Sequence, residues 1–159
     1  MRDAPAEFDP TLKATLDEAK GMLAAGDVPA AMVVYERAWT VTTAAQDHHH
    51  ASVVAHMAGV AEPDLDRKLR WNLDALREAD ATEDRERVAG FYSSLYGNLA
   101  FSYAMLGDLD TALRYQELAV SRLPDIEPGP YRDRVVSGTE RQTERLRAKI
   151  ADRDAATAG

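Results

Sequence analysis

The 159 residues carry a net charge of −8 and include no cysteine. The length fits one domain of ordinary size, the acidic balance argues against a nucleic-acid-binding surface, and the lack of cysteine excludes thiol nucleophiles and cysteine-ligated zinc or iron–sulfur centres. No apolar run approaches the ~20 residues of a membrane span, and the first residues lack the apolar stretch of a signal peptide, so a cytoplasmic protein is favoured.

The first recognisable unit, after residues 1–8 that are expected to be frayed, is a helical hairpin over Leu12–Thr43. Its turn is predicted at Gly26-Asp27, where glycine breaks the first helix and aspartate caps the second. Prolines lie only near the ends of predicted segments, and alternation of β-branched residues is almost absent. This pattern is typical of an all-helical protein.

All four histidines follow this hairpin, within the segment AAQDHHHASVVAHM. On a helix, successive residues point 100° apart, so His48, His49 and His50 face three directions. Metal-binding helices pair their ligands at a spacing of three or four residues, and no two histidines here have that spacing. We therefore predict no metal site.

The middle of the chain forms a second, weaker pair of helices. One helix is predicted over Asp47–Val60 and the other over Asp64–Asp80, with a turn at Glu62-Pro63. Leucines form the apolar stripe of the second helix, at positions 65, 69, 73 and 76. The turn glycine of the first hairpin has no counterpart here.

The clearest hairpin covers Tyr96–Pro124 and turns at Gly107-Asp108. When Gly26 is aligned with Gly107, alanines of the two hairpins coincide, and this self-similarity indicates a helical repeat. A seventh helix is predicted over Tyr131–Asp152, with a polar outer side suited to capping the end of a repeat array. Residues 153–159 are expected to be frayed.

The third hairpin resembles the tetratricopeptide repeat over the whole 34-residue length of that motif. The residues whose spacing resembles the motif's signature are Tyr96, Leu99, Ala100, Tyr103, Gly107, Ala112, Ala119 and Pro124. It departs from the motif in having Tyr96 where tryptophan is usual and Gln116 where a large apolar residue is usual. Three strings, AHMA, WNLDAL and SLYGNLAFSY, are together similar to a group of small bacterial tetratricopeptide proteins of unassigned function.

The resemblance implies a right-handed helical solenoid of about three hairpins plus a C-terminal capping helix, forming one domain over residues 9–152. Stacked hairpins bury a continuous core and leave a concave face lined by the first helix of each pair. When Leu69 is aligned with Ala112 and one extra turn residue is allowed, Ser52 falls level with Ser94 and His56 level with Asn98.

We therefore expect a peptide-binding groove that includes residues from the middle and third hairpins. The candidate residues are His49, Ser52, His56, Ser94, Asn98 and Phe101. For Asn98 the resemblance implies a hydrogen bond to the main chain of a bound peptide. The alternative for these residues is a solvated inner face, with His56 bonded between helices.

The leading functional hypothesis is a non-catalytic adaptor that binds a protein or peptide in this groove, without a cofactor, a nucleic-acid partner or a membrane. The chain has no glycine-rich phosphate loop, G-x-S-x-G or H-E-x-x-H motif, which argues against an enzyme. Two alternatives stay open. One is a structural protein whose end helices pair into a homodimer, and the other is a regulatory domain that senses a small ligand.

Overall fold

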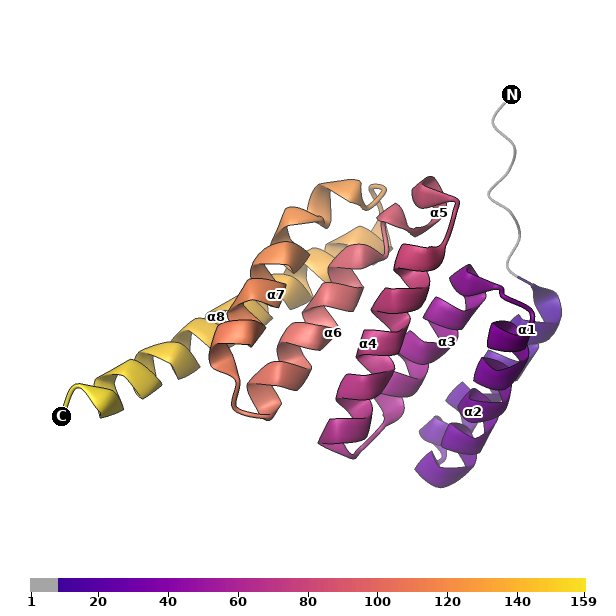
Figure 1. Ribbon diagram of the computed structural model, residues 1–159, viewed down its shortest axis with the longest axis horizontal. Coiled ribbons are helices and arrows are strands. Elements are labelled where there is room, and N and C mark those ends of the chain that lie inside the picture. The colour runs from indigo at the N-terminus through magenta and orange to yellow at the C-terminus, as the bar shows by residue number, and fades with distance from the viewer. Residues whose placement is uncertain (1–8) are drawn as a thin grey trace. The chain divides into compact units, whose positions relative to one another are not determined.

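The computed structural model describes residues 9–159, so the prediction for residues 1–8 lies outside the described part. The described chain is all-helical and contains no strand, which confirms the predicted class (Figure 1). The elements are α1 (Pro10–Ala24), α2 (Val28–Ala44), α3 (His48–Ala61), α4 (Leu65–Ala81), α5 (Arg85–Ala89), α6 (Tyr92–Met105), α7 (Leu109–Ser121), the short 3-10 helix η1 (Leu123–Asp125) and α8 (Pro130–Thr157).

Two helices differ from the prediction. The short helix α5 was not predicted as a separate element, and α8 continues past the predicted end at Asp152, so that residues 153–157 of the segment 153–159 are helical. Within that segment Arg153 donates to Asp110 of α7 at 2.9 Å and to Asp154 at 3.0 Å. The first of these ion pairs ties the last turns of α8 to its neighbour.

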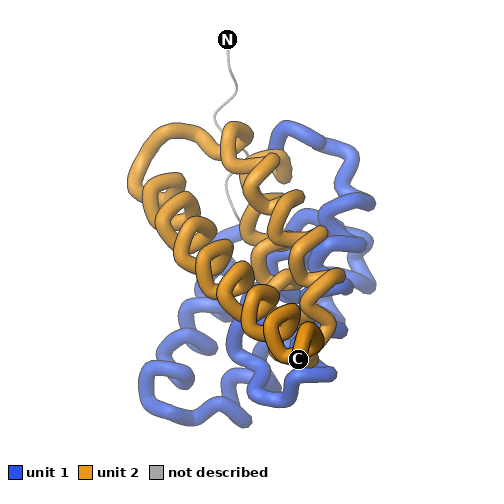
Figure 2. Tube along the Cα trace, turned by 90° about the vertical axis from the view of Figure 1, so that its left-hand side faces the viewer, with its two compact units in different colours: residues 1–87 blue, residues 88–159 orange. Residues whose placement is uncertain are grey.

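The chain divides into two compact units. The first unit ends at Arg87 and the second begins at Val88 (Figure 2). The first holds α1 to α4, and the second holds α6, α7 and α8. The single domain expected over residues 9–152 stays a prediction.

Three turns share one backbone geometry. Gly26, Gln46 and Gly107 adopt left-handed φ angles of 81°, 55° and 90°. Each is followed by an aspartate whose carboxylate accepts a hydrogen bond from a backbone N–H in the first turn of the next helix. A left-handed residue ends one helix and an aspartate cap starts the next, so the chain reverses within a few residues.

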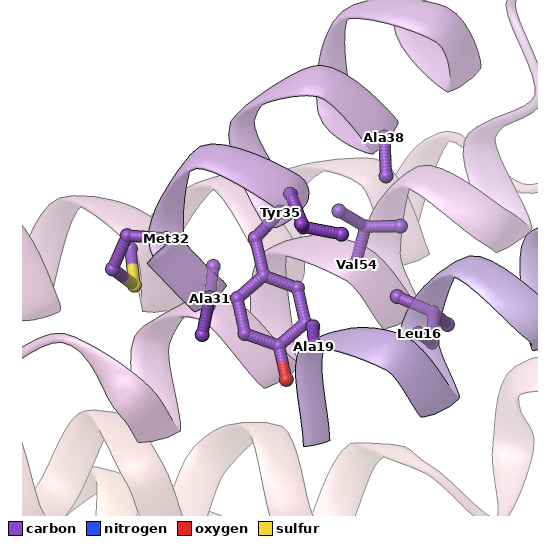
Figure 3. Packing of buried hydrophobic residues seen from close by; sticks show 9 residues of the cluster. Leu16, Ala19, Ala31, Met32, Tyr35, Ala38 and Val54 are labelled. Carbon is purple, nitrogen blue, oxygen red and sulfur yellow. The ribbon is translucent and has the colours of Figure 1, made fainter. Parts of the chain in front are cut away.

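The core of the first unit combines small residues on α1, α2 and α3 with a few large side chains, which occupy the space that the small residues leave. Tyr35 is 1% exposed and lies near Ala19 of α1 and Ala31 of α2 (Figure 3). The cluster comprises Leu16, Ala19, Ala31, Met32, Val34, Tyr35, Ala38, Val54 and Ala58. Burial of this apolar surface is the main stabilising contribution for helices whose own propensity is modest.

In the second unit α8 packs against both members of the α6–α7 hairpin. Gln116 of α7, 1% exposed, links the helices by donating to the Thr139 carbonyl at 3.1 Å and to the Thr143 hydroxyl at 2.8 Å. Gln142 of α8 donates to the Gln116 side chain at 2.7 Å and to the Gly97 carbonyl at 2.8 Å. Gln116 therefore anchors α8 to α7.

Two helical glycines make a matched test of packing. A Cβ atom at Gly59 would clash with Oδ1 of the buried Asn72, whereas a Cβ at Gly97 would meet nothing within 4 Å. Gly59→Ala is expected to destabilise the protein by about 1–3 kcal/mol because Asn72 must shift. Gly97→Ala is expected to stabilise it by about 0.4–1 kcal/mol by restricting the unfolded chain. Urea denaturation of both variants measures the difference, and equal effects would contradict the close approach at Gly59.

Candidate functional site

The middle and third hairpins can be aligned with each other because each contains the same kind of hydrogen bond between its two helices. The Ser52 hydroxyl donates to the Ala75 carbonyl at 2.8 Å, and the Ser93 hydroxyl donates to the Ala119 carbonyl at the same distance. Both serines are buried, and each joins the first helix of a hairpin to the second. Ser52 therefore corresponds to Ser93, one residue away from the Ser94 expected from the sequence.

Two further pairs of positions agree with this register. Gly59 and Ala100 lie seven residues after the respective serines, and both are buried. Asn72 and Gln116, both buried amides, lie three residues before Ala75 and Ala119. In this register His56 is equivalent to Gly97 and not to Asn98. A shift by one residue rotates a helical position by 100°, so the two alignments place His56 on different faces.

The structure shows the surroundings of two candidate residues, Ser52 and His56. Ser52 is 0% exposed and its hydroxyl is bonded to Ala75, so it lies in the interior and not on a ligand-accessible surface. His56 is partly buried, and burial lowers its pKa to about 4, so its ring is neutral at neutral pH. His56 and Asn98 belong to different units, and the expectation that they share one groove stays a prediction.

The three consecutive histidines have different surroundings. His48 Nδ1 lies 2.7 Å from Glu78 Oε2, and His50 Nδ1 lies 2.6 Å from Asp47 Oδ2. His49 packs edge-to-face on His50, and burial, helped by the charges of Arg87 and His50, lowers its pKa to about 4. Across residues 9–159 no group of three or more histidine and carboxylate side chains is arranged to hold a metal ion.

The three candidates on α6 lie beside α8. The hydroxyls of Ser94 and of Tyr131 on α8 are 3.0 Å apart and share a hydrogen bond. Asn98 is partly buried one turn later, and Phe101 is 45% exposed one turn further still. Spacings of four and three residues place these side chains along one stripe of the helix.

At the end of this stripe the structure forms a cleft that the sequence analysis missed. Phe101 and Met105, each 45% exposed, lie on its α6 side, and Arg145 and Lys149 lie on its α8 side, with Leu146 buried between. Its volume of about 80 Å³ is well below the ~300–1,000 Å³ of typical small-molecule sites, so it suits one side chain of a larger partner. We name this surface, with Ser94 and Asn98, the α6–α8 face.

The cations of the α6–α8 face have no acidic partner among the residues that the structure describes. Neither Arg145 nor Lys149 forms an ion pair there, whereas Lys13 and Lys20 on α1 both pair with Asp17. Exposed cations beside exposed apolar side chains attract a carboxylate attached to an apolar group. The signal was present in the sequence as the spacing of Arg145 and Lys149, but only the packing of α8 places it beside Phe101.

The first unit contains a separate cavity of about 340 Å³. Leu12, Val41 and Ala45 contribute apolar lining, and the hydrogen-bonded pair Asp47 and His50 also lines the cavity. Partial burial raises the pKa of Asp47, but hydrogen bonds from the side chain and backbone of His50 outweigh it and keep that pKa below its usual value. This pair caps α3 and braces the turn before it.

No family model matches the sequence, and neither the curated proteins nor the solved structures that were compared with it include a match. No helix in the described part of the chain is both long and apolar enough to cross a membrane.

Proposed function

We propose that this chain is a tetratricopeptide-like helical-repeat module that binds a segment of a partner protein and performs no catalysis. The proposal is supported by the recurrence of one construction in the first and third hairpins: a left-handed turn glycine, an aspartate cap and small residues at close helix contacts. The serine-to-carbonyl bond of the middle and third hairpins adds to it. Repeats of this kind present long helix faces on which a peptide can lie.

The single observation that carries the binding proposal is the α6–α8 face. Phe101 and Met105 give an apolar contact, Arg145 and Lys149 give two cations one helical turn apart, and Asn98 lies one turn before Phe101 on α6. The segment that fits this combination carries an apolar side chain flanked by acidic residues. The apolar side chain would fill the cleft, and the carboxylates would meet the cations at its rim.

The experiment is fluorescence-anisotropy titration with short labelled peptides that carry one leucine flanked by glutamates. Peptides with lysines in place of the glutamates serve for comparison. The wild-type chain is expected to bind the acidic peptide more tightly, and the double substitution Arg145→Glu with Lys149→Glu is expected to weaken that binding by about tenfold or more.

A matched control keeps the change in net charge the same. Arg37→Glu with Arg70→Glu reverses two exposed arginines of the first unit that also lack ion-pair partners within residues 9–159. This variant is expected to bind the acidic peptide nearly as well as the wild type. Equal weakening by both double variants would mean that only net charge matters, and equal affinity for acidic and basic peptides would refute the proposed partner class.

A further inference from the structure

A second groove lies on another side of α8, between that helix and α7. Its volume of about 540 Å³ exceeds that of the cleft at the α6–α8 face. Leu113 and Val120 of α7 and Ile150 and Ala151 of α8 contribute its apolar surface, and Val120 is 45% exposed. The charged residues Glu117, Arg147 and Asp154 stand among them.

The α8 side of this groove has an ordered pattern. Arg147, Ile150, Ala151 and Asp154 follow one another at spacings of three, one and three residues, so they form one stripe of the helix. The apolar pair is in the middle, with a cation toward the N-terminus and an anion at the same distance toward the C-terminus. When the helix direction is reversed about the midpoint of the stripe, Asp154 takes the place of Arg147 and Arg147 takes the place of Asp154.

A stripe with this antisymmetry is complementary to an antiparallel copy of itself. With a two-fold axis passing between Ile150 and Ala151, Arg147 would meet Asp154 of the partner subunit, and the same contact would form again on the other side. The two apolar residues would pack at the centre. Arg147 has no ion-pair partner in the described part of one chain, whereas Asp154 is paired there only with the adjacent Arg153.

We propose that two copies of this chain form a homodimer through the α7–α8 groove, with their α8 helices antiparallel. The charge pattern favours a second copy of this chain as the partner, because that copy presents an anion, Asp154, to Arg147 and a cation, Arg147, to Asp154. Arg145 and Lys149 line the cleft with α6 and not this groove, so the dimer leaves the α6–α8 face open. The inference does not depend on the proposed peptide binding.

The test is sedimentation equilibrium of the full chain and of two charge-reversal variants. The wild type is expected to dimerise at micromolar concentration. Arg147→Glu brings two carboxylates together at each contact, and Asp154→Arg brings two guanidinium groups together, so each variant alone is expected to dimerise about tenfold more weakly or worse. Both substituted positions are exposed, and circular dichroism melting checks that the variants fold.

Mixing the two variants provides the decisive result. In the mixed dimer, glutamate at position 147 of one chain meets arginine at position 154 of the other, and the native pair forms at the second contact, so dimerisation is expected to return. The double variant Arg147→Glu with Asp154→Arg should also dimerise on its own. A monomeric wild type, single variants that dimerise as tightly as the wild type, or a mixture that stays monomeric would each overturn the proposal.

Discussion

Replacing Leu99 by alanine is expected to lower the free energy of unfolding by about 2–5 kcal/mol. Leu99 is 0% exposed in the middle of α6, so its truncation removes buried methyl groups and leaves a cavity in the packed hairpin. For a chain of this length each kcal/mol shifts the melting temperature by about 2–4 °C. Urea denaturation and thermal melting followed by circular dichroism measure both quantities.

The neighbouring substitution Asn98→Ala is the control, because it changes the same helix at a partly exposed position. It is expected to change the stability by no more than about 0.5 kcal/mol and to weaken peptide binding by about 1–3 kcal/mol if its amide holds the peptide. If Asn98→Ala destabilised the protein as much as Leu99→Ala, Asn98 would stabilise the packing of helices, and its assignment to the α6–α8 face as a binding residue would be wrong.

Replacing Gln116 by alanine is expected to loosen α8 from the rest of the second unit. The change removes two donated hydrogen bonds and one accepted bond at a position that is 1% exposed, and it leaves a cavity. Together these losses are expected to cost about 2–4 kcal/mol. Limited proteolysis should cut α8 faster than in the wild type, because every one of these bonds joins α7 to α8.

The exposed neighbour Glu117 provides the matched control, since Glu117→Ala leaves the bonds to α8 intact. It should show wild-type proteolysis and nearly wild-type stability. Gln116→Ala should also weaken binding of the acidic peptide, because Arg145 and Lys149 reach the cleft only while α8 is docked. Unchanged proteolysis of α8 in the Gln116 variant would mean that apolar contacts such as Leu146 hold the helix without the amide network.

Local signals in the sequence were sufficient for much of the helical architecture. Gly26-Asp27 and Gly107-Asp108 mark turns because glycine tolerates a left-handed backbone and aspartate caps the next helix, and both turns have that geometry. The turn at Gln46 has the same conformation without glycine, and the sequence predicted the break between Thr43 and Asp47 but not its left-handed residue. The extension of α8 to Thr157 was missed because its support, the ion pair between Arg153 and Asp110, joins residues far apart in the sequence.

The register of the middle hairpin was decided only by tertiary contacts. Without a turn glycine to align on, the leucines of α4 suggested one register, while the bond from Ser52 to Ala75 fixes another. The two residues are 23 positions apart, and their counterparts Ser93 and Ala119 are 26 apart, so the middle hairpin has a shorter connection. An error of one residue in the alignment turns a helical side chain by 100°. This is why Ser52 was predicted to line a groove although it lies in the core.

The sequence by itself therefore determined the all-helical class and the positions of two hairpin turns, because each depends on residues within a few positions of one another. Only the tertiary structure decided which stripes meet. Phe101 and Arg145 come together because α8 crosses α6 at one angle, set by the amide network at Gln116 and the burial of Leu146. Such an angle is a property of packed surfaces, which no local pattern of residues contains.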